Sequence, residues 1–197
     1  EYRDGDNPRH IHWRSWARAG YPVVKEFRQE YFPRTALILD THRKGRRLRL
    51  TSRPPEDPVF EAAISLAAAT GDYLARKDYV VDLFAAGPDI YRFQSGRSLG
   101  FFENILEVLA CIKPHPGEPF EKLSPEIIQE ISYISSAVII LLTWNEERRS
   151  LVDSLVSAGV RLKAIYVRDN KEPPADLPEF VSVVDAATIR TGNCTSI

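Results

Sequence analysis

The sequence of 197 residues contains no methionine and only two cysteines, Cys111 and Cys194. The cysteines lie far apart and match no metal-ligand spacing, so the sequence predicts neither a disulfide framework nor a zinc site. We expect Cys111 to be a small, buried apolar residue. Because the chain has no methionine even at position 1 and begins within a charged motif, we expect it to be part of a longer protein.

Long apolar runs and catalytic motifs are also missing from the sequence. No run approaches the ~20 apolar residues of a membrane-spanning helix, so no membrane insertion is expected of these residues. No glycine-rich phosphate loop follows a predicted strand, which excludes nucleotide binding of the dinucleotide or Walker type. No serine stands in a nucleophile elbow, and neither cysteine lies beside a base. The sequence therefore predicts no catalytic residue and a non-enzymatic domain.

Charge is divided unevenly along the chain. Residues 1–53 hold 13 Lys and Arg against 6 Asp and Glu, and residues 54–197 hold 13 against 21, which sum to the 26 and 27 of the whole chain. This asymmetry indicates either a basic face for an acidic partner or two halves that neutralise each other. The basic loop 43–53 is a candidate for binding anionic surfaces, through Arg43, Lys44, Arg46, Arg47 and Arg49. It has no aromatic residue for base stacking, so no nucleic acid is expected as a partner.

Buried strands alternate with amphipathic helices along most of the chain. Continuous apolar runs predict strands at 35–40, 79–84, 137–143 and 162–167, with short strands at 90–93 and 180–184 and a half-buried strand at 21–27. Helical periodicity and capping residues predict helices at 57–76, 101–112, 124–134 and 146–158. This alternation predicts a three-layer α/β fold, Rossmann-like, with a mostly parallel central sheet and helices on both faces. We expect one structural domain, in which a segment of residues 1–34 packs on residues 35–190 and a polar tail follows at 191–197.

Asp40 ends the first long apolar strand, at the edge of the sheet where ligands bind in open α/β folds. Residues 40–44, DTHRK, resemble the first metal-ligand segment of von Willebrand factor A domains, which reads Asp-x-Ser-x-Ser and suits Mg²⁺. Here both serines are replaced, Lys44 would repel a divalent cation, and residues 143–145, TWN, lack the later aspartate of that family. The resemblance implies a degenerate site with no metal and no cofactor, and Mg²⁺ at Asp40 is the alternative. Otherwise Asp40 caps a helix or turn, or pairs with an arginine.

Two histidines in the opening segment are candidates for metal binding or proton transfer. His10 and His12 would share one face of a strand, with Asp6 nearby. No third ligand is evident, so we interpret them as hydrogen-bonded, partly exposed histidines. A divalent-metal-dependent binder or hydrolase that uses Asp6, His10, His12 and Asp40 is the alternative function.

Residues 1–27 read EYRDGDNPRHIHWRSWARAGYPVVKEF. The pattern E-Y-R-x-G-D-x-x-R-x-I-x-W-x-x-x-A-R-x-G, followed by V-K-E-F, closely resembles the signature of the family catalogued as domain of unknown function 58. In that family the signature precedes a von Willebrand factor A-like domain, and the Leu-Asp end of its next strand matches residues 39–40. The resemblance implies a partner of MoxR-type AAA+ ATPases that acts in the assembly or maturation of other proteins. It also implies a place at the cytoplasmic face, often with an inner-membrane anchor ahead of the signature.

The same segment has a physical interpretation beside this resemblance. Arg9 and Arg18 can form bidentate pairs with the nearest carboxylates, Glu1 and Asp6. The indoles of this segment are expected to supply large buried areas. The segment is then either a structural clasp or a surface that recognises a partner. The candidates for partner contact are Asp6, Arg9, His12, Trp13, Arg18, Asp40 and Trp144.

Overall fold

The computed structural model describes residues 2–3, 7–25, 33–43, 57–86, 89–94 and 99–192. The chain forms two compact units, Glu1–Tyr31 and Phe32–Ile197. Among the described residues, no helix is both long and apolar enough to cross a membrane.

The first unit consists of short helices joined by one bridge. The 3-10 helix η1 (Pro8–His10) is capped by Asn7, and the helix α1 (Trp13–Ala19) ends at Gly20, whose φ of 77° places it in the left-handed region that suits glycine. Residues 21–25 do not form the predicted strand, because their partner segment between the two helices is only two residues long. The pairing is a single antiparallel bridge between Ile11 and Val24. Residues 26–27 lie outside the described part.

The second unit contains a six-stranded sheet in the order β3-β2-β1-β4-β5-β6. Only the edge strand β3 is antiparallel to its neighbour, and all other neighbours are parallel. The predicted mostly parallel fold is confirmed. The strands are β1 (Arg34–Leu39), β2 (Val80–Ala86), β3 (Ile90–Gln94), β4 (Ser136–Leu141), β5 (Arg161–Arg168) and β6 (Ser182–Asp185).

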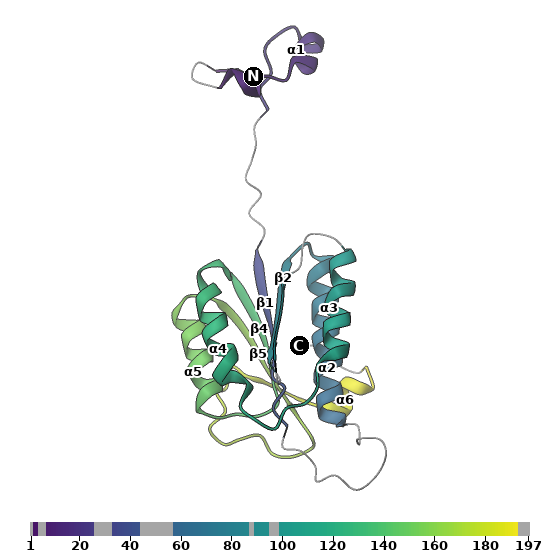
Figure 1. Ribbon diagram of the computed structural model, residues 1–197, viewed down its shortest axis with the longest axis vertical. Helices are drawn as coiled ribbons and strands as arrows, with labels where there is room; N and C mark the ends of the chain where they lie inside the picture. Colours follow the sequence, from purple (N-terminus) through teal and green to yellow (C-terminus); the bar gives the residue numbers. More distant parts are fainter. Residues whose placement is uncertain are drawn as a thin grey trace. The chain divides into compact units, whose positions relative to one another are not determined.

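Helices cover both faces of this sheet (Figure 1). One face carries α2 (Pro58–Arg76), α3 (Leu99–Cys111) and α6 (Ala186–Arg190), and the other carries α4 (Pro119–Glu130) and α5 (Glu146–Ser157), with the 3-10 helix η2 (Ile131–Tyr133) after α4. Side chains of β1 alternate between the two cores: Leu37 and Leu39 face α2, while Ala36 and Ile38 face α4 and α5. The same alternation directs Asp40 toward α4 and α5.

Two helix boundaries follow the capping signals in the sequence. Asp57 accepts hydrogen bonds from the backbone N–H of Val59 and Phe60, with Pro58 as the first helical residue of α2. Asn145 caps α5, and Gly159, with φ of 78°, follows its end. Both helix starts were correctly predicted.

Two further predictions from the sequence are wrong, and one helix was not predicted. Helix α4 begins at Pro119 and not at Ser124, and Pro125 lies inside it. The internal proline is tolerated because the carbonyl that it deprives of a hydrogen bond belongs to Glu121, an exposed residue that water can reach. Cys111 is exposed at the end of α3 and not buried. The short helix α6 had no counterpart among the predicted elements.

Candidate functional site

Asp40 directly follows β1 and is fully buried. Its Oδ1 accepts a hydrogen bond from the backbone N–H of His42 at 2.9 Å, and its Oδ2 accepts from those of Leu142 at 3.0 Å and Thr143 at 3.3 Å. These amides lie just after β1 and β4, where the strands have ended and backbone N–H groups lack partners in the sheet. The carboxylate thus ties together the ends of two neighbouring strands.

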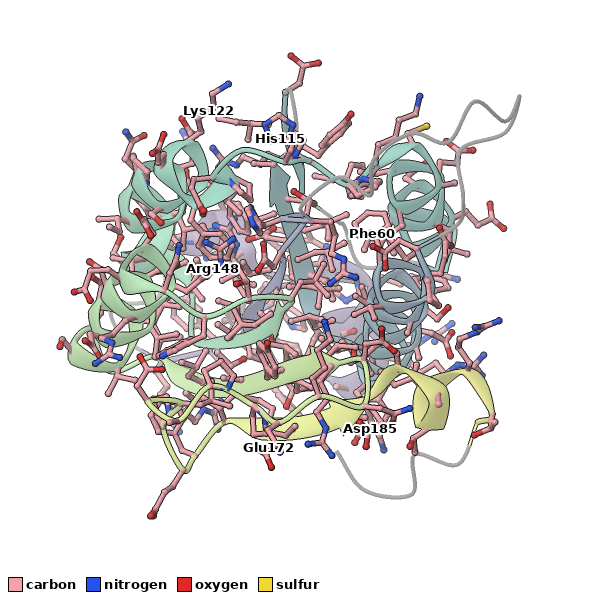
Figure 2. All side chains as sticks on the ribbon, turned by 90° about the horizontal axis from the view of Figure 1, so that it is seen from below. Phe60, His115, Lys122, Arg148, Glu172 and Asp185 are labelled. Carbon is pink, nitrogen blue, oxygen red and sulfur yellow. The ribbon has the colours of Figure 1, made fainter. Side chains whose placement is uncertain are left out.

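Arg148 supplies the remaining hydrogen bonds to this carboxylate. It is the third residue of α5 and its side chain is 0% exposed. Nη2 donates to Asp40 Oδ1 at 2.9 Å and Nε donates to Oδ2 at 3.0 Å, which makes a bidentate pair. The guanidinium carbon lies 4.6 Å from the centre of the Phe120 ring of α4. Figure 2 shows Arg148 in the interior, among the sheet, α4 and α5.

The third guanidinium nitrogen contacts two helix caps. Arg148 Nη1 donates to Glu118 Oε2 at 2.5 Å and to Asn145 Oδ1 at 3.0 Å. Glu118 is the N-cap residue of α4 and Asn145 that of α5, and Asn145 Nδ2 also donates to Glu118 Oε2 at 3.3 Å. We call Asp40, Glu118, Asn145 and Arg148 the arginine cluster. It joins the strand ends to the starts of both helices on this face.

A short parallel pairing holds Glu118 in place. His42 and His115 form an isolated bridge, in which His115 N–H donates to Thr41 O at 2.8 Å and Arg43 N–H donates to His115 O at 2.9 Å. His42 Nδ1 lies 2.7 Å from Gly117 O and 3.7 Å from Glu118 Oε1. The residue before α4 is therefore fixed against the segment that carries Asp40.

The cluster contains two carboxylates and one guanidinium, a formal balance of -1. Burial opposes the charge of Arg148, but its hydrogen bonds and ion pairs with Asp40 and Glu118 outweigh burial and raise the pKa of Arg148 above its ordinary value. Burial alone would raise the pKa of Glu118, yet the hydrogen bond and charge of Arg148 hold it below its ordinary value. Arg148 and Glu118 are therefore both ionised at neutral pH.

A divalent cation does not fit this arrangement. Both oxygens of Asp40 are occupied by five N–H donors, two of them from Arg148. Mg²⁺ requires carboxylate oxygens that are free to coordinate it. Within the described residues, no group of three or more His, Cys, Asp or Glu is arranged to hold a metal. Asp40 pairs with an arginine, which is one of the alternatives left open by the sequence.

The candidate site residues of the first unit do not have the arrangement that the predicted histidine site requires. His10 lies in η1 and His12 is the N-cap residue of α1, so the two do not share the face of a strand. His12 Nδ1 is 2.6 Å from Ser15 Oγ. Arg9 lies in η1 and Arg18 in α1, and Asp6 is outside the described residues.

The tryptophan pair of α1 is the main aromatic feature of the first unit. Trp13 stacks on Trp16 with ring centroids 5.2 Å apart and an interplanar angle of 19°. Trp13 is 66% exposed, and neither η1 nor α1 contains a buried residue. Within its own unit, Trp13 therefore lacks the large buried area that the sequence predicts for it.

The other candidates lie in the second unit. Trp144, between β4 and α5, is buried, and Arg149 lies over its ring at 5.8 Å. Arg43 forms a bidentate pair with Asp57 at 2.6 and 3.0 Å, so this member of the basic loop contacts the cap of α2. Lys44, Arg46, Arg47 and Arg49 lie outside the described residues. The partner contacts predicted for these residues stay predictions.

Sequence reasoning missed Glu118 and Arg148. Glu118 lies in a proline-rich segment between the helices predicted at 101–112 and 124–134. Arg148 lies in the charged run EERR at a helix start, which is typical of a solvated face. One signal was available. Asn145 as the cap places Arg148 in the first turn, where a cation is unfavourable next to the positive end of the helix unless an anion offsets it.

The fold is similar to solved von Willebrand factor A domains. A von Willebrand factor type A protein from Catenulispora acidiphila matches with a TM-score of 0.56 and 13% identity over 82% of this chain. This chain spans 41% of the length of that protein's chain. The SpRpn10 VWA domain and the conserved hypothetical protein BatB from Bacteroides thetaiotaomicron both have TM-scores of 0.46, with 11% and 15% identity over 79% and 75% of this chain and 88% and 72% of theirs.

No family model and no curated protein matches the sequence. At 13% identity the likeness to the Catenulispora domain concerns the fold alone. The second unit has a von Willebrand factor A-like fold.

Proposed function

We propose that this chain is a non-enzymatic protein-interaction domain that binds its partner without a metal ion. We further propose that it belongs to the domain of unknown function 58 family and that the partner is a MoxR-type AAA+ ATPase. The signature in residues 1–27 supports the family and the partner class. The von Willebrand factor A-like fold of the second unit supports an interaction role.

The observation that supports binding without a metal ion is that hydrogen-bond donors occupy both carboxylate oxygens of Asp40. An ion that bridges two proteins needs an open coordination position toward the partner. The carboxylate instead accepts five N–H donors, and the guanidinium that pairs with it is 0% exposed. Neither group can bridge to a ligand, so recognition would use other surfaces.

The first unit offers the better recognition surface. Its stacked pair Trp13–Trp16 presents a rigid aromatic area, and Trp13 is 66% exposed. Tryptophan and arginine are the residue types that most often dominate binding energy at protein interfaces. Arg14 and Arg18 lie on the same short helix. We propose that this helix contacts the ATPase.

The test is the affinity of the purified chain for a nucleotide-free MoxR-type ATPase, measured by biolayer interferometry with Mg²⁺ and with EDTA. We expect equal Kd values in both buffers. Trp13→Ala should weaken binding by tenfold or more, the size typical of an aromatic interface anchor at about 1.4 kcal/mol per tenfold. Tyr73→Ala is the matched control, because Tyr73 is an aromatic residue 61% exposed on α2 of the second unit.

The three results separate the parts of the proposal. Binding that disappears in EDTA overturns metal-free recognition. Equal losses for Trp13→Ala and Tyr73→Ala overturn the assignment of the surface to α1. No binding of any MoxR-type ATPase in either buffer overturns the partner class.

A further inference from the structure

We infer that the second unit binds an acidic amphipathic helix of a partner protein, on a part of its sheet that none of the described helices covers. This open face lies over the amino-terminal halves of β4 and β5, beside the end of α2. Its residues are Tyr73, Ser136, Val138, Arg161 and Lys163. The inference does not depend on the proposed ATPase contact, which uses α1 of the first unit.

Paired residues of β4 and β5 show where the cover of this sheet face ends. Ile140 pairs with Ile165, and both are buried in the core that the sheet shares with α2. The next two pairs on the same face, toward the amino ends of the strands, are Val138–Lys163 and Ser136–Arg161. In both pairs the β4 residue is only partly buried and the β5 residue is exposed. Parallel strands inside a sheet are normally covered on both faces, so a cover is missing here.

The apolar stripe of α2 loses its cover at the same end of the sheet. Ala62 and Leu66 are buried, whereas Tyr73, seven residues after Leu66 and on the same side of the helix, is 61% exposed. The helix that packs beside α2 on this side is α6, which lies at the lower end of the face in Figure 1. It has 5 residues against 19 in α2, about 8 Å against about 28 Å. It is therefore too short to reach Tyr73.

The two cations of the open face are not neutralised by other described residues. Arg161 and Lys163 form no ion pair within the part of the chain that the structure describes. They lie two residues apart on β5, so their Cα atoms are about 6.6 Å apart. Positions i and i+4 of an α-helix are about 6 Å apart along its axis. Two carboxylates at that spacing can therefore face both cations from a helix that lies along β5.

The remaining residues determine the other side of the partner helix. Tyr73 and Val138 make the α2 side of the open face apolar, while the β5 side is cationic. A helix with an apolar stripe beside an acidic one matches this division, and a helix is the usual cover of a sheet face in α/β folds. The charge pattern thus selects an acidic helix and rejects a basic one.

The experiment measures the binding of two labelled helical peptides to the purified chain by fluorescence anisotropy. Each peptide has about 14 residues and is stapled, because free helices of this length are marginal in water. Both carry the same leucine stripe. One has glutamates at positions i and i+4 beside it, and the other has lysines there. We expect only the acidic peptide to bind, with an affinity that decreases as NaCl is added.

Variants of exposed residues locate the binding surface. Lys163→Glu should weaken binding of the acidic peptide by about tenfold or more, because it replaces an attraction by a repulsion. Arg161→Glu/Lys163→Glu should exchange the preference and bind the lysine peptide. Lys113→Glu, the same change at an exposed lysine after α3, is the matched control and should keep the affinity of the natural chain.

Two further variants separate this surface from the one proposed for the ATPase. Tyr73→Ala should weaken binding of the acidic peptide, and Trp13→Ala should not. Circular dichroism spectra that match the natural chain show that each variant is folded.

The inference is overturned if the natural chain does not bind the acidic peptide, or binds both peptides equally. A double variant that still prefers the acidic peptide also overturns it, since the cations would then not select the ligand. Self-association of the natural chain that Tyr73→Ala abolishes would mean that a second copy occupies the open face. That result overturns the assignment to a partner protein.

Discussion

Two buried carboxylates on the same face of the sheet have very different surroundings. Asp40 accepts five hydrogen bonds, three from backbone amides and two from Arg148. Asp82 lies within β2, with a side chain that is also 0% exposed. Its Oδ2 accepts from Arg34 Nε at 2.9 Å and lies 2.6 Å from Arg34 Nη2. Its Oδ1 has no partner among the described atoms.

Their places along the strands explain the difference. In the middle of β2 the backbone N–H groups bond to neighbouring strands, so Asp82 must rely on side chains alone. Beyond the end of β1, free N–H groups are available and converge on Asp40. Burial raises the pKa of Asp82, and the charge and hydrogen bond of Arg34 do not offset it. A buried carboxylate is thus well stabilised at the end of a strand and poorly stabilised inside one.

The largest effect that tests this comparison is expected for Asp40→Asn. The amide keeps the shape of the side chain, but its NH₂ group would face N–H donors from Arg148 or from the backbone. The buried guanidinium would also lose its main counter-ion, so we expect a loss of about 3–5 kcal/mol in the free energy of unfolding. Urea denaturation followed by circular dichroism measures it. A loss below about 1 kcal/mol would contradict the role given to Asp40.

A double-mutant cycle sharpens this result. Asp40→Leu/Arg148→Met removes both charges and keeps apolar volume in the core. We expect it to be more stable than the single variant Asp40→Leu, because no unpaired buried charge remains. The difference between the double variant and the sum of the single variants gives the coupling energy. A coupling energy near zero would mean that Asp40 and Arg148 contribute to stability independently of each other.

An intermediate effect is expected for Glu118→Gln. Glu118 is 32% exposed, so solvent weakens its ion pair and we expect a loss of about 1 kcal/mol at neutral pH. Because the pKa of Glu118 is lower in the folded state than in the unfolded chain, its contribution is present above the unfolded value of about 4.3 and is lost as the pH falls through the folded pKa. Urea titrations at several pH values should show that the free energies of unfolding of Glu118→Gln and the natural chain converge in acid. Glu121→Gln, the same change at an exposed residue of the same helix, is the control for general charge effects.

Much of the fold could be predicted from the sequence, while the arginine cluster could not. Apolar runs mark the central strands, and Asp57 and Asn145 are local capping signals that act within three residues. The pair Arg148–Asp40 joins residues 108 positions apart, and its burial depends on how α5 packs on the sheet. Glu118 reaches the cluster only because α4 begins at Pro119. No local pattern carries such long-range information, although Asp40 itself was identified from its place after β1.

The smallest effect is expected for Asp82→Asn, the matched change at the second carboxylate. Arg34 would keep a second anion, since its Nη2 lies 3.9 Å from Glu130 and its side chain is 26% exposed. We therefore expect stability within about 1 kcal/mol of the natural chain at neutral pH.

The pKa of Asp82 is higher in the folded state than in the unfolded chain, so its contribution is complete below the unfolded value of about 3.9 and declines as the pH rises. In urea titrations, the free energy of unfolding of Asp82→Asn relative to the natural chain should rise as the pH increases from about 4. This trend is opposite in sign to the trend for Glu118→Gln. If Asp82→Asn were as destabilising as Asp40→Asn, position along the strand would not determine how well a buried carboxylate is stabilised.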